Sequence, residues 1–532
     1  MSSKVNNIQL PIILAIALAI GFMLGYKIDK PSKQVAGHAS DSKIAEVYKL
    51  IEEHYFDTIE QATYIDEVVR NILAGLDPHS SYMTKQETQD FTTSMSGEFE
   101  GIGIQFNMLN DTLTVASVIA GGPSEKVGLL PGDKIVVVDG DTIAGVHIQN
   151  SEIIKKIRGK KGTKVNIELI RPDVKTPLTF TIKRDAIPIN SIDYSYIIAP
   201  KTGYISIDNF NMTTAEEFEK ILSNMVYNRQ VDKLIIDLRG NPGGFLGAAV
   251  AICDEMLPKG EMIVYAQGLH FPKQVYKASS RGLYSKKNQK VVILIDENSA
   301  SASEVVSGAI QDNDRGIIIG RTSFGKGLVQ TQYQLSDGSE IMLTVARYYT
   351  PLGRCIQRPF KYGEGEEYYM NAIQRYETGE MQDTLSQPKD NVKYVTRSGK
   401  VLYGGGGITP DIIVPIKTSK DIVYFNLLAN SGVVYQYALQ YGHKNRNILK
   451  NKYKNTNDFL ANFEVTEAMV NEIVKKGEEQ SIKQPMTDMS KQSLKKWTKA
   501  YIGKIVFGDD AYYPLIHQDD DVIKKALEVL NN

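Results

Sequence analysis

The sequence predicts an α/β core with a mostly parallel sheet, an inserted β-rich domain, N-terminal helices and a helical C-terminal domain. Within residues 186–416, short apolar runs alternate with helical patterns, which indicates crossover connections between parallel strands. Residues 97–185 instead contain short β-type runs separated by glycine-rich turns, and residues 417–532 show only helical periodicity. The strands and helices expected in the core are, in chain order, residues 203–207, 214–228, 234–238, 245–257, 291–295, 303–311 and 316–320.

The composition is that of an ordinary globular protein with three or four domains of about 150 residues each. The chain has 532 residues and a net charge of −1, so its charge gives no reason to expect nucleic acid as a partner. The seven histidines lack the spacing of metal ligands, and we expect neither a metal nor another cofactor. For the two cysteines, Cys253 and Cys355, two free buried thiols are favoured over one disulfide.

The N-terminus carries an apolar run over residues 8–24, preceded by Lys4 and followed by charged residues. Its length lies between that of a signal-peptide core and that of a short membrane span, and no small-residue cleavage site follows closely. We therefore expect an uncleaved signal anchor within residues 1–30, a linker over 31–41 and a helical segment over 42–96. This arrangement predicts a membrane-anchored protein whose bulk is exported to the periplasmic side of the cell envelope.

A serine between a strand and a helix is the first candidate for chemistry. Ser301 follows a buried strand and precedes a helical pattern, a position that exposes a hydroxyl near the positive end of a helix. Lys326 and Gln330 follow nearby, and a serine with a lysine is an alternative to serine with histidine for acyl transfer. The lysine must be neutral to accept a proton, and burial can lower its pKa. Because residues four apart on a strand share a face, Gln330 is expected to orient Lys326.

A glycine-rich turn supplies the expected oxyanion hole. Residues 237–244 follow a buried strand and open a helix, and glycine lets the backbone approach a substrate closely. The backbone N–H groups of Gly244 and Ala302 are the candidate donors. Taken separately, Ser301 could cap a helix and Lys326 could be a surface charge, but their combination with Gln330 and this turn favours a catalytic site.

Residues 320–327 also approach the Walker A pattern of nucleotide-binding proteins. The final position is Gly327, so no hydroxyl is present to bind magnesium, and the residues that follow are not helical. The sequence therefore argues against a nucleotide site here.

The β-rich segment resembles a PDZ domain. It opens with Gly101, Ile102, Gly103 and Ile104, which match the loop where such domains hold the carboxylate of a peptide that joins a sheet edge. We also expect Arg158 to couple peptide binding to the core, because it lies between an apolar residue and a glycine at the far end of the domain.

Over residues 42–415 the chain resembles the C-terminal processing peptidases, also called tail-specific proteases. This resemblance implies that Ser301 is the nucleophile, Lys326 the base and Gln330 the third member, with Gly244 and Ala302 forming the oxyanion hole. Pro242 departs from the family pattern, in which a further glycine is common. The motifs that carry the resemblance are LDPHSSYM from Leu76, DLRGNPGG from Asp237, SASASE from Ser299, FGKG from Phe324, TPLGR from Thr350 and GITPDI from Gly407.

The same resemblance implies a crotonase-like core and cleavage of exported proteins at or near their C-terminal tails. The PDZ domain would recognise the free C-terminus of the polypeptide substrate. The alternatives are a membrane-tethered PDZ interaction scaffold with an inactive core and an esterase or amidase for small molecules. The sequence leaves open whether the protein forms a homo-oligomer or uses an adaptor, and an insertion over residues 358–404 has no assigned place in the core.

Overall fold

The computed structural model describes residues 39–109, 111–119, 121–171, 174–279, 282–377, 392–416 and 419–532. The expected signal anchor lies outside these residues, as does most of the expected linker, and both stay predictions. None of the helices in the described segments is both long enough and apolar enough to cross a membrane. The chain divides into two compact units, Met1–Val69 and Arg70–Asn532.

Two helices account for the described part of the first unit. They are α2 (Ala39–His54) and α3 (Gln61–Ala74), which continues into the second unit. Tyr48 of α2 contacts Tyr64 of α3, with ring centroids 6.5 Å apart. α3 and most of α2 fall within residues 42–96, the segment expected to be helical, but α2 begins three residues earlier, within the expected linker.

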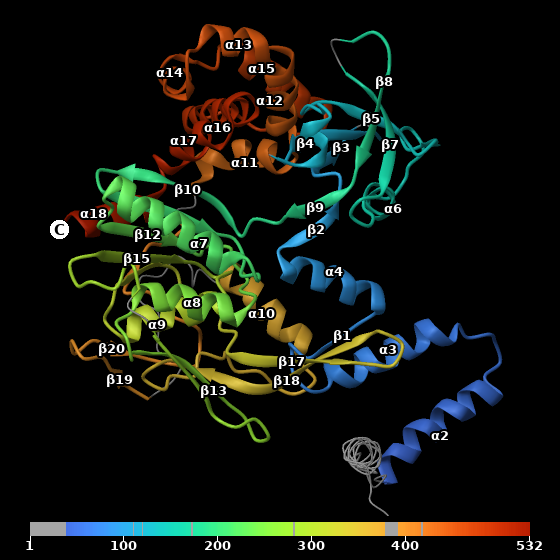
Figure 1. Ribbon diagram of the computed structural model, residues 1–532, viewed down its shortest axis with the longest axis vertical. Helices are drawn as coiled ribbons and strands as arrows, with labels where there is room; N and C mark the ends of the chain where they lie inside the picture. Colours follow the sequence, from blue (N-terminus) through green and yellow to red (C-terminus); the bar gives the residue numbers. More distant parts are fainter. Residues whose placement is uncertain are drawn as a thin grey trace, which may run out of the picture. The chain divides into compact units, whose positions relative to one another are not determined.

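A six-stranded sheet lies at the centre of the second unit, with its strands in the order β10-β11-β12-β15-β16-β21 (Figure 1). β10 is antiparallel to β11, whereas every neighbouring pair from β11 to β21 is parallel. β11, β12, β15 and β16 fall where the alternation in the sequence predicts strands. The bounds are β10 (Ile192–Ala199), β11 (Thr202–Ile207), β12 (Lys233–Asp237), β15 (Lys290–Ile295), β16 (Ile317–Gly320) and β21 (Ile412–Ile413).

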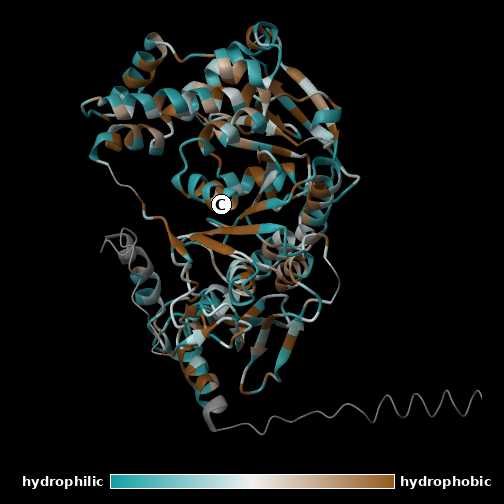
Figure 2. Ribbon diagram, turned by 90° about the vertical axis from the view of Figure 1, so that its left-hand side faces the viewer, coloured by the Kyte–Doolittle hydropathy of each residue, from teal (hydrophilic) through white to brown (hydrophobic). Residues whose placement is uncertain are grey.

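The two faces of this sheet pack against different helices, because successive residues of a strand point to opposite faces. Ile236 and Ile293 belong to a buried cluster that includes residues of α7 (Thr214–Ser223), α8 (Leu246–Met256) and α9 (Ala302–Asp312). Ile235 and Val292 belong to another cluster, which includes Ile523 of α18 (Asp521–Asn531). The central strands are largely brown in Figure 2, as this burial on both faces requires. A π-helical turn, η1 (Asn224–Asn228), extends α7.

A second, antiparallel sheet was not predicted. Its strands follow the order β1-β18-β13-β14, and β17 also pairs with β18. The core therefore combines one largely parallel and one antiparallel sheet. The strands of the second sheet are short or carry polar residues, so they lack the apolar runs that mark strands buried on both faces. The bounds are β1 (Ser81–Met83), β13 (Met262–Gln267), β14 (Gln274–Lys277), β17 (Leu328–Gln334) and β18 (Glu340–Tyr349).

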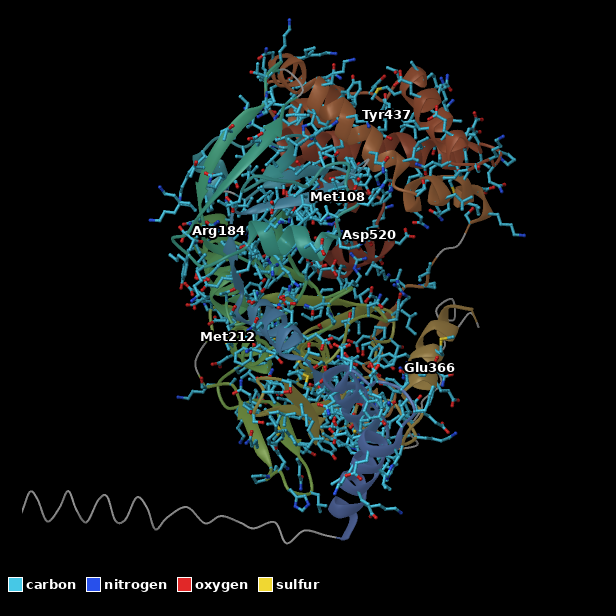
Figure 3. All side chains as sticks on the ribbon, turned by 90° about the vertical axis from the view of Figure 1, so that its right-hand side faces the viewer. Met108, Arg184, Met212, Glu366, Tyr437 and Asp520 are labelled. Carbon is cyan, nitrogen blue, oxygen red and sulfur yellow. The ribbon has the colours of Figure 1, made fainter. Side chains whose placement is uncertain are left out.

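The β-rich domain forms a separate sheet in the order β3-β4-β5-β7-β8, in which β3 is an edge strand. The antiparallel pair β2–β9 joins this domain to the core, and α4 (Lys85–Ser96) precedes it. Arg184, at the junction of β8 and β9 (Figure 3), fixes the loop after α6 by donating to the carbonyls of Lys156, Ile157 and Lys164. The elements are β2 (Glu98–Gly101), β3 (Ile104–Met108), β4 (Leu113–Val118), α5 (Pro123–Lys126), β5 (Lys134–Val138), β6 (Asp141–Thr142), α6 (Asn150–Ile157), β7 (Lys164–Ile170), β8 (Leu178–Lys183) and β9 (Asp185–Pro188).

The C-terminal helices have a buried apolar cluster of their own, in which Leu428, Tyr437 and Phe459 take part. α18 packs against the sheet through its apolar residues, and Tyr513 and His517, the first and last residues of α17, contact tyrosines of β10 and β11. The other elements are η2 (Lys420–Ile422), α11 (Val423–Asn430), α12 (Val433–Lys444), α13 (Arg446–Lys452), α14 (Thr456–Asn462), α15 (Glu467–Glu479), α16 (Asp488–Phe507), η3 (Asp509–Ala511) and α17 (Tyr513–His517).

The insertion contributes α10 (Gly365–Glu377), β19 (Tyr394–Val395) and β20 (Val401–Leu402). Both cysteines are free, as predicted, although Cys253 is buried and Cys355 only half-buried.

Candidate active site

Three of the candidate residues lie in loops that follow neighbouring parallel strands. The loop after β12 carries Gly244, the loop after β15 carries Ser301, and the loop after β16 carries Lys326. Because β12, β15 and β16 are adjacent and parallel, these loops leave the same edge of the sheet. The carboxyl edge of a parallel sheet is where α/β proteins place their ligands.

Ser301 is held in an unusual backbone conformation at the start of α9. Its φ is +52° and its ψ is −109°, a combination that costs a residue with a side chain about 1–3 kcal/mol. The strain persists because the turn is fixed on both sides: the Ser301 N–H donates to Glu304 Oε2 over 2.8 Å, and the Ala300 N–H donates to the carbonyl of Asn241 over 3.0 Å. The serine is therefore displayed at the N-terminus of a helix, as the sequence predicts.

The glycine-rich loop lies directly against this serine. A Cβ built on Gly243 would lie 2.8 Å from Ser301 Cβ and 2.9 Å from the Ala302 nitrogen, so only glycine allows this approach. Next to it, the N–H groups of Gly244 and Ala302 donate to no acceptor within the described residues. Two unpaired N–H groups on either side of a serine form a suitable site for an oxyanion.

Asn241 joins the two loops and was not singled out from the sequence. Its side chain is fully buried, donates to the Ile207 carbonyl over 2.7 Å and accepts from the Gly243 N–H over 2.8 Å. Its backbone carbonyl accepts from the Ala300 N–H and from the Ser303 hydroxyl, each over 3.0 Å. The asparagine thus fixes the glycine loop relative to the serine turn.

Glu304 links the serine turn to the lysine loop, and it too was missed. The carboxylate is fully buried and accepts four hydrogen bonds at 2.5–2.8 Å, from the N–H groups of Ser301, Gly325 and Lys326 and from the Ser323 hydroxyl. Burial raises the pKa of Glu304, and these hydrogen bonds partly offset that effect. A glutamate three residues after a helix N-cap is a recognised capping pattern, so a local signal was present in the sequence.

Lys326 and Gln330 do not share a strand, and the expectation that they point to one face of it is wrong. Lys326 precedes β17, and a register shift interrupts the β17–β18 pairing between Val329 and Gln330. The Gln330 amide donates to the His79 carbonyl over 2.8 Å. No hydrogen bond joins the Lys326 amine to Ser301 or to Gln330 among the residues described.

The segment that precedes β1 lies beside Lys326. Asp77 accepts from the backbone N–H groups of His79 and Ser80, from the Ser80 hydroxyl and from the Thr344 hydroxyl of β18. Burial, followed by the charge of Lys326, lowers the pKa of His79 to about 4, so this imidazole is neutral at physiological pH. The segment thus places a neutral histidine and a carboxylate near Lys326.

The insertion packs on the lysine loop, which the sequence did not indicate. The guanidinium of Arg358 lies between two rings, 4.9 Å from the centroid of Phe324 and 4.1 Å from that of Tyr368 in α10. The Tyr368 hydroxyl donates to the Gly325 carbonyl over 3.3 Å. Tyr368 and Arg358 therefore brace the turn that carries Lys326.

The predicted peptide-binding loop opens the edge strand β3. The N–H groups of Ile102 and Gly103 donate to no acceptor in the part of the chain that the structure describes, whereas Gly101 and Ile104 belong to strands. Arg158 lies over the ring of Phe99 in β2, with its Cζ 4.9 Å from the centroid. Its predicted coupling role stays a prediction.

Comparison with known proteins connects this geometry to a family. The chain is 35% identical to the carboxy-terminal processing protease CtpB of Bacillus subtilis over 319 residues. This match covers 59% of this chain and 65% of CtpB. It is 33% identical over 353 residues to CtpA of the same bacterium, which covers 65% of this chain and 74% of CtpA. The chain belongs to the carboxy-terminal processing proteases of peptidase family S41. The resemblance inferred from the motifs is thereby confirmed.

Different family models match three separate regions of the chain. The model of peptidase family S41 matches residues 201–362, a PDZ domain model matches residues 101–183, and a family of unknown function matches residues 424–508. Among solved structures, a photosystem II D1 C-terminal processing protease is 27% identical, with a TM-score of 0.34, and the match covers 58% of this chain and 83% of that protein. The chain spans just under two thirds of the length of CtpB.

Gly244→Ala is expected to lower kcat/KM by about 10²–10³-fold, the effect of losing one oxyanion-hole donor. The added Cβ would lie 2.0 Å from the Phe210 carbonyl oxygen, and the φ of +137° disfavours any side chain, so the loop must move. Gly240→Ala is the matched control, since Gly240 lies in the same loop at a φ of +73° with no atom within 4 Å of the new Cβ. Equal rate losses in the two variants, measured with one peptide substrate, would contradict the assignment of Gly244.

Activity is expected to rise with pH through the pKa of Lys326. Burial lowers this pKa, although Glu304 and Asp77 partly oppose it. If Lys326 is the base, only its neutral amine can accept a proton, so the rate increases until the amine is deprotonated and then levels off, with a midpoint below the ordinary value of about 10.4. The pKa of His79, about 4, is too low to cause this rise. A profile of kcat/KM that stays flat between pH 6 and 10, with chemistry rate-limiting, would exclude lysine as the base.

Proposed function

We propose that this protein is a serine endopeptidase that cleaves exported proteins at or near their C-terminal tails. The observation that carries the proposal is the position of Ser301, at the start of α9 and between the unpaired N–H groups of Gly244 and Ala302. The carboxylate of Glu304 links the backbone of this serine to the backbone of Lys326. The family membership supports the same reading.

The proposed reaction begins when the neutral amine of Lys326 accepts the proton of the Ser301 hydroxyl. The serine oxygen then attacks the peptide carbonyl, and the oxyanion accepts hydrogen bonds from the N–H groups of Gly244 and Ala302. The protonated lysine gives its proton to the nitrogen of the scissile bond, which leaves as an amine while the acyl group stays on the Ser301 oxygen. The same lysine then deprotonates a water molecule that attacks this ester, and it returns the proton to the Ser301 oxygen as the ester bond breaks. In this scheme Gln330 orients the amine after a small movement, since its amide is held by the His79 carbonyl in this structure.

The PDZ domain is proposed to capture the free C-terminus of the substrate. Its edge strand β3 can pair with an extended peptide, and the N–H groups of Ile102 and Gly103 can receive the terminal carboxylate. The names of the B. subtilis relatives, carboxy-terminal processing proteases, are consistent with this use. Arg158, stacked on Phe99 of β2, is the proposed connection from this domain to the core.

Amidation of a peptide's C-terminus is expected to raise KM with little change in kcat, because the carboxylate binds to the PDZ domain rather than to the reacting atoms. The measurement compares the free-acid and amidated forms of one apolar-tailed peptide, with products mapped by mass spectrometry and Ser301→Ala as the inactive control. Equal cleavage of both forms would contradict the proposed role of the PDZ domain but would still be consistent with the proposed protease activity. Peptide binding without cleavage by the wild-type protein would instead favour a PDZ scaffold with an inactive core.

We further propose that residues 1–30 anchor the protein in a membrane with the catalytic part on the periplasmic side. The apolar run over residues 8–24 supports this proposal. The relation of the core to crotonase-like folds also stays a proposal, based on the motifs alone.

A further inference from the structure

The C-terminal part of the chain reaches the loop that carries the oxyanion donors. The helix α18 packs against the sheet through Ile523 and Leu530. Asp520 immediately precedes this helix and is labelled beside it in Figure 3. The matched family of unknown function ends at residue 508, so this contact lies outside it.

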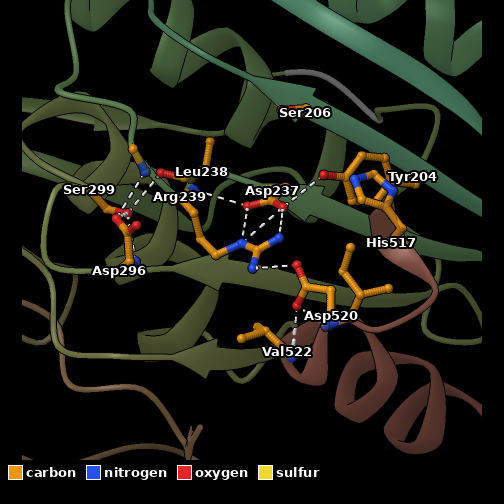
Figure 4. A network of polar contacts seen from close by, with 12 residues as sticks. Tyr204, Ser206, Asp237, Leu238, Arg239, Asp296, Ser299, His517, Asp520 and Val522 are labelled. Carbon is orange, nitrogen blue, oxygen red and sulfur yellow. Dashed lines mark hydrogen bonds and ion pairs between the residues drawn. The ribbon is translucent and has the colours of Figure 1, made fainter. Parts of the chain in front are cut away.

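Asp520 forms an ion pair with Arg239, the second residue after β12. Its Oδ2 lies 2.8 Å from Arg239 Nη1, while the other side of the guanidinium forms hydrogen bonds of 2.6–3.1 Å with the carboxylate of Asp237 (Figure 4). Tyr204 completes the surroundings of Asp237 by donating its hydroxyl over 2.8 Å. Asp237 is buried and the side chains of Arg239 and Asp520 are each 21% exposed, so solvent screens these contacts only in part.

Arg239 is also the residue from which the glycine loop starts. The next residue, Gly240, donates its N–H to Asp296 over 2.9 Å, and the N–H of Asp296 donates to the Ser299 hydroxyl over 2.9 Å. Ser299 in turn donates to the carbonyl of Leu238, between Asp237 and Arg239, over 2.8 Å. Figure 4 shows this connected network, which extends from the C-terminal segment to the serine turn.

We propose that Asp520 is a positioning residue, which holds Arg239 so that the loop over residues 239–244 presents its N–H groups to the oxyanion. The C-terminal segment would thus be required for full catalytic rate although it contributes no group that touches the substrate. This proposal rests on the proposed function, because it deepens the role of the same site.

The charges indicate that this contact adjusts the loop rather than holding the fold together. Asp237 alone neutralises Arg239, so the loss of the Asp520 charge leaves no unpaired buried cation. Asp520 also caps α18, since its Oδ1 accepts from the N–H groups of Val522 and Ile523. Asparagine at this position can retain the cap while it weakens the ion pair.

Asp520→Asn is therefore expected to lower kcat by about tenfold to 10²-fold, with KM changed by less than twofold and the thermal unfolding midpoint nearly unchanged. Asp519→Asn is the matched control: it removes a charge from the adjacent residue, which pairs with Lys496 and is 71% exposed. Wild-type kcat in Asp520→Asn, or the same loss in Asp519→Asn, would overturn the proposal.

A double-mutant cycle with Arg239→Gln separates positioning from a general structural effect. If Asp520 acts through Arg239, its substitution costs little further rate in the Arg239→Gln background. Additive losses would mean that Asp520 acts by another route, and the proposal would be wrong.

Amide hydrogen exchange of residues 239–244 gives a readout that does not depend on proteolysis. Faster exchange in Asp520→Asn than in Asp519→Asn is expected, and equal exchange would contradict the coupling. If the wild-type protein cleaves no peptide, the proposed function fails, yet this measurement still decides whether the C-terminal segment holds the loop.

Discussion

Ser301→Ala and Lys326→Ala are each expected to abolish peptide cleavage, and the double variant is expected to be no slower than either single variant. The reason is that nucleophile and base act as one unit, so removal of either leaves nothing for the other to do. The losses should reach the limit of detection, whereas stability should change little, because neither change leaves a buried carboxylate unpaired. The comparison requires kcat/KM for the three variants on one peptide.

Lys361→Ala serves as the control for this experiment, since Lys361 is 76% exposed and pairs with Glu364 on the surface. Its activity should match that of the wild type. Substantial turnover by Lys326→Ala would show that another group takes the serine proton, and the lysine assignment would then be abandoned.

Glu304→Ala is expected to lower the free energy of unfolding by more than about 3 kcal/mol and to abolish activity in the fraction that stays folded. Each buried donor left without an acceptor costs about 1–3 kcal/mol, and four donors lose their acceptor here. The activity is lost because the carboxylate that binds the backbone N–H groups of both Ser301 and Lys326 is gone. Denaturant unfolding gives the stability, and kcat/KM well below the unfolding midpoint gives the activity.

Glu304→Gln should be milder in stability, because the amide oxygen still accepts while the amide nitrogen cannot. Glu219→Ala, on the exposed surface of α7, should stay within about 0.5 kcal/mol of the wild type. If Glu304→Ala unfolded no more easily than Glu219→Ala, the carboxylate would not be the connection that its hydrogen bonds indicate.

Local signals in the sequence located the main candidates. Ser301 and Gly244 were found because each lies at a strand-to-helix turn, where an apolar run, a glycine or small residue and a helical pattern follow one another. The parallel strands were found for the same reason, since strands buried on both faces read as continuous apolar runs. Structural features that depend on residues close together in the chain could thus largely be predicted from the sequence.

Features set by distant parts of the chain were not accessible. Glu304 accepts hydrogen bonds from residues 19 to 22 positions away, and Arg358 meets Phe324 only after the chain has folded. Lys326 and Gln330 were expected on one strand, but Lys326 lies before β17 and the pairing register shifts just before Gln330. Such irregularities depend on the pairing of strands rather than on composition. The Asp520–Arg239 contact joins the C-terminal segment to the core across a long sequence separation and carries no motif.

The backbone conformation of Ser301 allows a prediction of how this position would change in evolution if the hydroxyl were not needed. At a φ of +52°, glycine would be more stable than serine, so the presence of the hydroxyl lowers the stability of the folded protein. Selection for heat resistance alone would favour glycine in place of this serine, and the resulting protein would be more stable but would lack the proposed nucleophile. A serine at this position is therefore expected to persist only if its hydroxyl has the chemical role proposed here.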